Sequence, residues 1–407
     1  MIESDSPHFP VAGFRFAGVS CGIKPKTAAY GGRALDLALI ISDRPCNAAG
    51  VFTKNQFPAA PVLFDKETLA DNPAGIQAVV INAGNANACT GEQGLANAAA
   101  SARLVEEALE LPGGATLVLS TGVIGLPLPM EKIEAGIREA AVLARSETGQ
   151  SAQGLVLASQ AIMTTDTKPK TASRQAGPAT LLGIAKGAAM IHPNMATLLA
   201  VVVTDAAVEP NDLQAMLRSA ADRSFNAITV DGDQSTNDTL LVLANGLTGE
   251  VDLAAFEQAL TEVCQDLAQQ MVRDAEGASK FVTVHVTGAV DEDAAYQVAR
   301  TVASSVLFKT AVYGGDPNWG RVLMAAGNSG IDIDPGSVAL WFTGSGQPLQ
   351  VVAGGAPLVY SEDDAAAIFV GSDLDVRLDL GAGDGEATVW TSDLTHDYVT
   401  LNAHYRT

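Results

Sequence analysis

A threonine that follows a tight polar turn is the residue of this sequence with the most specific chemical potential. The His192-Pro193-Asn194 turn leads through Ala196 into a predicted buried strand that begins at Thr197. A β-branched residue at the start of a buried strand needs no functional explanation. The alternative is a nucleophilic hydroxyl that uses the α-amine of its own residue as the base, as in N-terminal-threonine enzymes. That chemistry requires cleavage of the chain between Ala196 and Thr197.

Acyl transfer also needs fixed hydrogen-bond donors where negative charge develops on the carbonyl oxygen. The turn STGVIG, residues 120–125, follows a short apolar run and offers the Thr121 hydroxyl and the Gly122 N–H. Glycine at this place allows the backbone to approach a ligand closely. A plain turn that ends a strand is the alternative interpretation.

The elements that must position these residues alternate between strand and helix, with short connections that contain glycine. The stretch 166–183 carries Lys168, Lys170 and two prolines, and it is expected to be an exposed loop. The alternation predicts an α/β fold with mixed sheets and helices packed outside them. Strands are expected at 78–82, 116–119, 198–203 and 281–286, and short alternating strands are expected after Ser337. Helices are expected at 94–110, 131–144, 253–271 and 291–306, and one more helix is expected to be capped by Asn211.

Composition excludes several classes of protein. The chain has 407 residues, with 24 Lys and Arg against 46 Asp and Glu, which gives a formal net charge of −22. This charge argues against nucleic acid or an anionic membrane as a partner. Hydrophobic residues at 47% and charged residues at 17% exclude a disordered chain and a charged coiled coil. The apolar runs are all shorter than the ~18 residues of a transmembrane helix.

The cysteines and the acidic clusters do not have the spacing of a metal site, so no metal and no resident cofactor is expected. The Asp231-Gly232-Asp233 cluster, with Asn237 and Asp238, departs from the EF-hand pattern and is interpreted as a polar loop. GGDPNWG, residues 314–320, lacks the end of a phosphate-binding loop and is interpreted as a rigid turn. Four scattered thiols and an N-terminus without a targeting pattern indicate the reducing cytoplasm. The thiols belong to Cys21, Cys46, Cys89 and Cys264.

The motifs around these residues resemble those of the ornithine acetyltransferases, the glutamate N-acetyltransferase family. The PNMATLL segment at 193–199 resembles the family's self-cleavage site. Further blocks follow in family order along nearly the whole chain. They are AAGVFTKNQFPAAPV (48–62), INAGNANACTGEQG (81–94), STGVIG (120–125), IMTTDT (162–167), SFNAITVDGDQSTNDT (224–239), AVYGGDPNWGRVL (311–323) and the C-terminal NAHYRT.

The resemblance implies a self-processing fold of the DmpA and ornithine acetyltransferase type. Cleavage would give an α-chain of residues 1–196 and a β-chain of residues 197–407, which together form one enzyme, with α2β2 assembly expected. The implied reaction is a ping-pong transfer of acetyl from N2-acetyl-L-ornithine to L-glutamate through acetyl-Thr197, in arginine biosynthesis. Whether acetyl-CoA also serves as a donor is left open by the sequence.

The resemblance also assigns roles to single residues. Thr121 and Gly122 match the family's oxyanion hole, and Lys186 matches a substrate-binding lysine. Either Thr164 or Thr165 is expected to bind substrate, and the sequence does not decide between them. The remaining substrate contacts implied by the resemblance are Glu276, Asn402 and Thr407.

Two positions depart from the family pattern, and two other functions remain as alternatives. Ala189 and Ala275 stand where family members usually have glycine, so a positive φ at either place would be strained.

A related self-cleaving aminopeptidase or amidohydrolase would pass the acyl group to water instead of glutamate. An uncut α/β binding protein without activity would remain a single chain.

Overall fold

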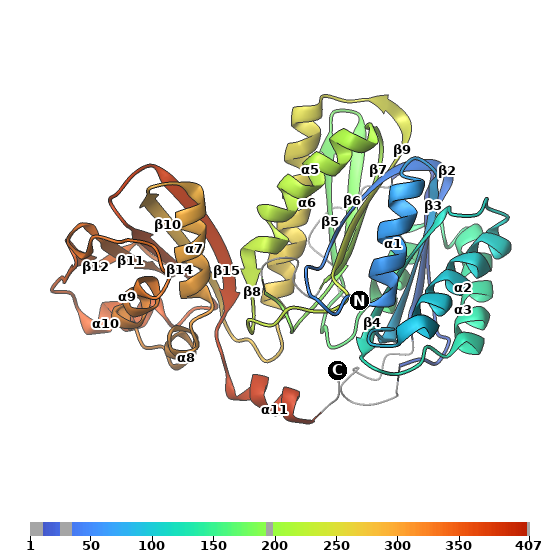
Figure 1. Ribbon diagram of the computed structural model, residues 1–407. Coiled ribbons are helices and arrows are strands. Elements are labelled where there is room, and N and C mark those ends of the chain that lie inside the picture. The colour runs from blue at the N-terminus through green and yellow to red at the C-terminus, as the bar shows by residue number, and fades with distance from the viewer. Residues whose placement is uncertain (1–10, 25–34, 193–197, 405–407) are drawn as a thin grey trace. The chain divides into compact units, whose positions relative to one another are not determined.

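The computed structural model describes residues 11–24, 35–192 and 198–404, which form two compact units (Figure 1). The first unit contains the described residues up to 226 together with 233–271. The second contains residues 227–232 and the described residues from 272 to 404. The chain therefore enters the second unit briefly at 227–232 before it returns to complete the first.

An eight-stranded mixed sheet forms the centre of the first unit, in the order β4-β3-β2-β9-β7-β6-β5, with β1 also paired to β2. The β3–β4 and β7–β9 pairs are parallel, and the other pairs are antiparallel. The strands are β1 (Phe14–Val19), β2 (Leu37–Phe52), β3 (Ile76–Asn85), β4 (Thr116–Val123), β5 (Lys170–Ala176), β6 (Ala179–Lys186), β7 (Leu199–Ala207) and β9 (Thr239–Glu250).

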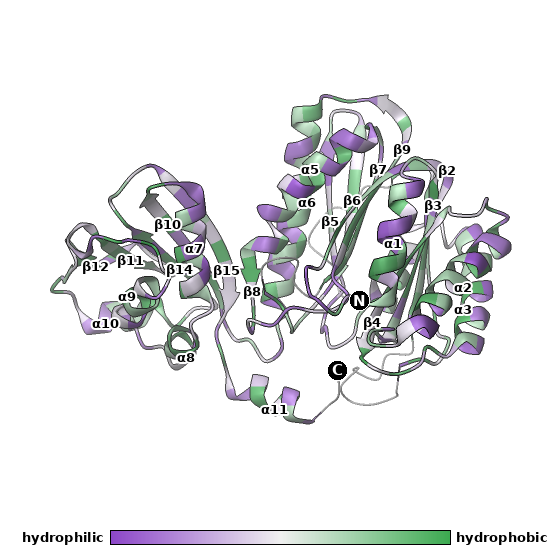
Figure 2. Cartoon of the chain, in the orientation of Figure 1, coloured by the Kyte–Doolittle hydropathy of each residue, from purple (hydrophilic) through white to green (hydrophobic). Residues whose placement is uncertain are grey.

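Helices cover this sheet because its strands are apolar on both faces. Leu39 packs in a cluster with Val105 and Ile137, whereas the next residue, Ile40, packs with Leu155 on the other face. The helices are largely hydrophobic on one side and hydrophilic on the other (Figure 2). They are α1 (Ala60–Asp71), α2 (Gly91–Leu109), α3 (Met130–Arg145), α4 (Ala152–Ala161), α5 (Pro210–Asp222) and α6 (Leu253–Arg273), of which α6 continues into the second unit.

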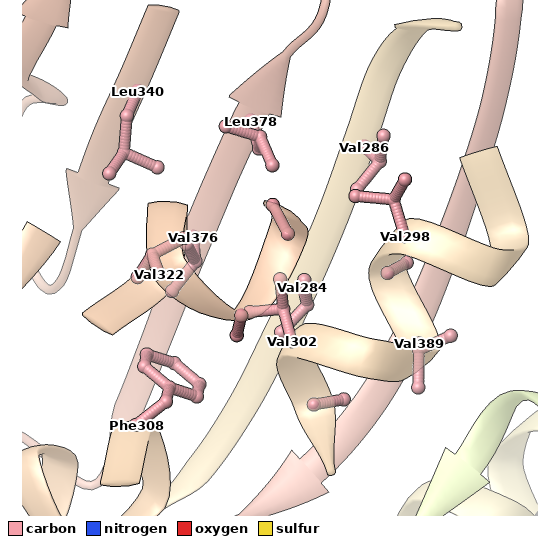
Figure 3. Close-up of a cluster of buried hydrophobic side chains, with 14 of the residues drawn as sticks. Val284, Val286, Val298, Val302, Phe308, Val322, Leu340, Val376, Leu378 and Val389 are labelled. Atoms are coloured by element: carbon pink, nitrogen blue, oxygen red, sulfur yellow. The ribbon is translucent and has the colours of Figure 1, made fainter. Parts of the chain in front are cut away.

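The second unit contains a seven-stranded mixed sheet in the order β13-β12-β11-β14-β10-β15-β8. Val284 of β10 and Val302 of α7 belong to its core, in which valine is the commonest residue (Figure 3). The strands are β8 (Ile228–Thr229), β10 (Phe281–Ala289), β11 (Ala339–Thr343), β12 (Leu349–Ala353), β13 (Ala356–Pro357), β14 (Asp373–Asp379) and β15 (Gly385–Ser392). The helices are α7 (Glu292–Ala303), α8 (Val306–Gly314), α9 (Trp319–Gly327), α10 (Glu362–Ile368) and α11 (His396–His404), and short 3₁₀ turns lie at Phe225–Ala227 and Pro335–Ser337.

The predicted α/β class with mixed sheets and packed helices is confirmed, but three local predictions are wrong. The stretch 166–183 is not an exposed loop: it contains β5 and most of β6, and Lys170 is buried because its ammonium pairs with Asp166. Asn211 does not cap α5, which begins at Pro210. The helix that Asp291 caps ends at Ala303, and α8 starts after a break.

None of the helices in the described residues is both long enough and apolar enough to cross a membrane.

Candidate active site

The predicted turn at 120–125 begins later than expected: β4 continues to Val123, so Thr121 and Gly122 lie near its end, beside β3 in the first unit. Thr121 pairs with Ala83 and Gly122 pairs with Gly84 in this parallel ladder. Gly122 has φ +132°, and a Cβ at this position would lie 2.3 Å from the carbonyl carbon of Gly84. Only glycine therefore fits here, because any side chain would collide with the backbone of β3.

Asn237, just before β9, holds this turn from the side. Its amide Nδ2 donates to the carbonyl oxygen of Ser120 at 2.8 Å and to that of Ala86 at 2.6 Å. The side-chain oxygen of Asn237 accepts from Thr236 at 2.6 Å, which fixes the orientation of the amide. The backbone next to Thr121 is thus held by a buried side chain from a distant part of the sequence.

The next residue, Asp238, binds the chain immediately after the expected nucleophile. Its Oδ1 accepts from the Leu198 N–H at 3.2 Å, and the N–H of Thr239 donates to the Leu198 carbonyl at 3.0 Å. Leu198 precedes β7, which lies between β6 and β9. Consecutive residues before β9 therefore hold both the oxyanion turn and the start of the strand that follows Thr197. The predicted nucleophile Thr197 and the cleavage partner Ala196 lie outside the described residues.

The predicted substrate-binding Lys186 ends β6 and pairs with Leu199 of β7, so it lies beside the backbone at Leu198. It is buried together with Asp166 and Lys170. Burial opposes ionisation of Asp166, but the charges of Lys170 and Lys186 outweigh it and hold the pKa of this carboxyl well below its usual value. One carboxylate between two ammonium groups leaves a net positive charge, which suits a substrate carboxylate.

Asp166 also organises the backbone around both predicted binding segments. Its Oδ2 accepts from the Thr164 N–H at 2.9 Å, and its Oδ1 accepts from the Gly187 N–H at 2.7 Å. Thr164 is buried and Thr165 is half-buried. The choice between these two hydroxyls as the substrate contact stays open.

The second unit brings together two further predicted residues. The Asn402 amide donates to the Glu276 carboxylate at 2.8 Å. Asn402 lies in α11, so this part of the C-terminal segment is helical, whereas the sequence suggests only a polar tail. A Cβ on Gly277 would lie 2.5 Å from the Tyr398 nitrogen, which shows how closely α11 packs on the segment that carries Glu276. Thr407, the last predicted contact, lies outside the described residues.

The two departures from the family pattern are accommodated without strain at the substituted positions. Ala189 and Ala275 are not among the non-glycine residues with positive φ. The left-handed backbone falls instead on their neighbours Met190, with φ 57°, and Gly277, with φ 68°. Neither alanine itself therefore adopts the left-handed backbone that favours glycine.

The acidic cluster and the GGDPNWG segment have structural partners. Asp231 accepts from the Tyr398 hydroxyl at 3.2 Å, and Asn318 caps α9 by accepting from the Arg321 N–H at 3.1 Å. These contacts agree with the interpretations as a polar loop and a rigid turn. Within the part of the chain that the structure describes, no three acidic, cysteine or histidine side chains are grouped to hold a metal ion.

Comparison with known proteins identifies the family. The ArgJ family model matches residues 15–407. The chain is 44% identical to the arginine biosynthesis bifunctional protein ArgJ of Thermotoga neapolitana, over 98% of this chain and 100% of that protein. The chain belongs to the ArgJ family. The ArgJ of Geobacter sulfurreducens is 48% identical over 98% of this chain and 100% of that protein.

Among solved structures, the chain is similar to the ornithine acetyltransferase of Mycobacterium tuberculosis complexed with ornithine. The two sequences are 39% identical, and the match covers 46% of this chain and 94% of that chain with a TM-score of 0.39. ArgJ family membership confirms the predicted family and enzyme class, an acetyltransferase of arginine biosynthesis.

Sequence reasoning missed the residues that support the site in this ArgJ-family chain. Asp166 and Asn237 lie inside the recognised blocks, but the sequence does not show which backbone groups they bind. The spacing of Asp166 and Lys170, four residues apart, is the one local signal that could have indicated an ion pair. Nothing local marks Asn237 as the partner of Ser120, because 117 residues separate them.

Proposed function

We propose that this enzyme transfers acetyl from N2-acetyl-L-ornithine to L-glutamate through an acetyl ester on Thr197. The observation that supports the proposal most is that two consecutive residues, Asn237 and Asp238, bind residues 120–122 of β4 and the backbone at Leu198, beside which the buried Lys186 lies. Residues 120–122, Lys186 and Leu198 would be a set of oxyanion donors, a cation for a carboxylate and the residue after the nucleophile. A site for acyl transfer to an amino acid requires these three parts.

Self-cleavage between Ala196 and Thr197 would create the mature site. The freed α-amine has a reference pKa of ~8, so part of it is neutral at cellular pH and can accept the hydroxyl proton. Because the base lies on the same residue as the nucleophile, no second side chain has to be positioned. The cut would fall between β6 and β7, which pair in the sheet, so hydrogen bonds would still join the α- and β-chains.

In the transfer step the Thr197 hydroxyl attacks the acetyl carbonyl, and charge develops on its oxygen. The Thr121 hydroxyl and the Gly122 N–H would donate to that oxygen. Ornithine leaves with a proton from the α-amine, and glutamate then attacks the ester by the reverse steps. The rigidity of the turn supports this role, since Asn237 and the β3 backbone hold it in place before substrate binds.

Substrate recognition would combine cationic, amide and carboxylate groups. Lys186 would bind the carboxylate of the amino acid, with Thr164 or Thr165 beside it. Glu276 would bind the distal ammonium of ornithine, and Asn402 fixes the Glu276 carboxylate by its hydrogen bond. Thr407 would supply a further contact. The same proposal includes acetyl-CoA as a second donor to glutamate. It also includes an α2β2 assembly in the cytoplasm.

The test is a donor comparison combined with detection of the covalent intermediate. The purified enzyme is incubated with N-acetylornithine alone, and the β-chain mass is measured. We expect a chain that begins at Thr197 and gains one acetyl group, which glutamate then removes as N-acetylglutamate. Thr197→Ala should give one uncut, inactive chain. Release of free acetate at the same rate without glutamate would instead support the hydrolase alternative.

A further inference from the structure

The buried Asp393 attaches the chain between β15 and α11 to the segment that follows Glu276. Its Oδ1 accepts from the N–H groups of Ser279 at 2.9 Å and Lys280 at 3.2 Å, and its Oδ2 accepts from the Ser279 hydroxyl. The Asp393 N–H donates in turn to the Lys280 carbonyl at 3.3 Å. These bonds fix the place where the chain leaves β15, but they do not involve α11 itself.

The buried Thr395 makes two hydrogen bonds with one hydroxyl group. It donates its proton to the Gly277 carbonyl at 2.7 Å, and its oxygen accepts from the Tyr398 N–H at 3.1 Å. The second bond joins residues three apart at the start of α11, which is how an N-cap side chain satisfies a free backbone N–H. Thr395 therefore begins the helix and attaches its N-terminus to the residue after Glu276.

Helix α11 depends on such polar contacts because its side chains bury little. It has nine residues, and none of them is buried within the part of the chain that the structure describes. A helix of this length is marginal without a cap or tertiary packing. The Tyr398 hydroxyl adds one polar contact, to Asp231 at 3.2 Å, and the His396 ring meets the ring of Tyr313 edge-on. Hydrogen bonds at its first residues therefore contribute strongly to the direction of α11.

The direction of α11 decides whether Asn402 reaches Glu276. Asn402 lies seven residues after Thr395, which is close to two turns of an α-helix, so both side chains lie on one side of α11. They bind adjacent residues, because Thr395 bonds to Gly277 and Asn402 bonds to the Glu276 carboxylate at 2.8 Å. A change of direction at the first residue would displace the far end of the helix and break the second bond.

We propose that Thr395 is a positioning residue for substrate binding, which directs α11 so that Asn402 holds the Glu276 carboxylate. The inference rests on the proposed role of Glu276 as the group that binds the distal ammonium of N-acetylornithine. The Thr395 hydroxyl then acts on the affinity for a substrate with a distal ammonium, and the steps at the acetyl group do not depend on it.

The experiment measures steady-state kinetics of Thr395→Val, which removes the hydroxyl and keeps the size of the side chain. Loss of an N-cap changes an equilibrium by roughly 3- to 30-fold, so we expect KM for N-acetylornithine to rise by that factor while kcat stays within about twofold. N-acetylnorvaline has the same carbon chain without the distal amine, and kcat/KM for this donor should be unchanged. A general loss of folded enzyme would instead lower the rates with both donors.

Thr400→Val is the matched control, and Thr395→Ser is the conservative variant. Thr400 also lies in α11, and its hydroxyl donates to the His396 carbonyl of the same helix at 3.0 Å. We expect Thr400→Val to keep the wild-type KM, because this bond stays within α11. Thr395→Ser retains a hydroxyl that can cap the helix and should also keep the wild-type KM.

A double variant shows whether Thr395 acts through Asn402. In an Asn402→Ala background, Thr395→Val should raise KM by less than about twofold further, because two changes that break the same contact are not additive. A purely structural effect of Thr395 would instead multiply with that of Asn402. Thr395→Ala, which also lacks the hydroxyl and adds no branched apolar group, takes the place of Thr395→Val if the latter does not fold.

The outcomes separate this inference from the proposed function. A wild-type KM in the Thr395 variant, or full additivity with Asn402→Ala, would overturn the inference about Thr395 alone. An unchanged KM for N-acetylornithine in Glu276→Gln would overturn the role of Glu276 and the inference with it. Absence of acetyl transfer from N-acetylornithine by the wild-type enzyme would overturn the proposed function itself.

Discussion

The side-chain amide of Asn237 lies 2.8 Å from the carbonyl oxygen of Ser120 and donates a hydrogen bond to it. Asn237 thereby fixes the residue before Thr121 through its backbone carbonyl. The predicted oxyanion residues are therefore held by the segment just before β9, the strand that pairs with β7.

Asn237→Asp should lower the rate of acetyl transfer more than substrate binding. Aspartate has the same size but cannot donate to the carbonyls of Ser120 and Ala86, and two buried acceptors lose their partner. We expect kcat to fall about 10- to 100-fold, because misplaced donors stabilise the transition state less. Steady-state kinetics with N-acetylornithine would check this. A change confined to KM would show that Asn237 acts on binding instead.

Thr121→Val should reduce kcat by about 10²- to 10³-fold, the usual effect of removing one oxyanion donor. KM for N-acetylornithine should change little, because the donor acts mainly on charge that develops in the transition state. Thr121→Ser retains a hydroxyl and serves as the control, with most of the activity preserved. Equal kcat values for the Val and Ser variants would remove Thr121 from the oxyanion role.

Asp166→Asn should destabilise the protein because it leaves the buried Lys170 ammonium without its carboxylate. Breaking a buried pair from one side costs about 3–5 kcal/mol. The double variant Asp166→Asn/Lys170→Met removes the uncompensated charge and should recover a large part of that loss. Urea unfolding at pH 7 measures both free energies. If the double variant is as unstable as the single one, the ion pair is not the origin of the effect.

Lys309 gives the second unit a pH-dependent stability. Burial lowers the pKa of Lys309 from 10.5 to about 7, although Asp231 and Asp393 oppose the shift, and its ammonium donates to the Val230 carbonyl at 2.7 Å. Between these pH values the unfolded chain binds the proton and the folded chain does not. The free energy of unfolding therefore rises with pH in this window, by up to about 1.4 kcal/mol per unit.

Lys309→Met should remove this contribution. The unfolding free energies of the two proteins, measured from pH 6 to pH 10, should differ in slope above pH ~7 and run in parallel below it. Parallel curves over the whole range would mean that Lys309 keeps its proton in the folded state.

Periodic and local signals in the sequence predicted the frame of the molecule. Helix α6 follows from apolar residues at helical spacing, and β10 follows from the alternation of apolar and polar residues along 282–286. Thr121 and Gly122 could be placed at a strand end because the turn lies directly after an apolar run. These features depend on neighbours within a few residues.

The contacts that complete the site depend on neighbours far along the chain. Lys170 has the local composition of a surface loop, and only Asp166 and the strands around it make burial of its charge possible. Asp238 reaches Leu198 across 40 residues of sequence, because β7 and β9 are adjacent in the sheet. No local pattern encodes that adjacency, so the roles of these residues could be seen only in the structure.

Removal of residues 402–407 should abolish acetyl transfer and leave self-cleavage intact. The shortened chain loses the amide that donates to Glu276 at 2.8 Å, and with it the predicted contact at Thr407. Cleavage needs only the turn before Thr197, its hydroxyl and the groups of the first unit, so two chains should still appear on a denaturing gel. Asn402→Asp is the matched point variant, because a second carboxylate beside Glu276 repels it and should raise KM for N-acetylornithine. A truncated protein that is cut and fully active would exclude Asn402 and Thr407 from the site, and one that is uncut and aggregated would show that α11 is needed for folding.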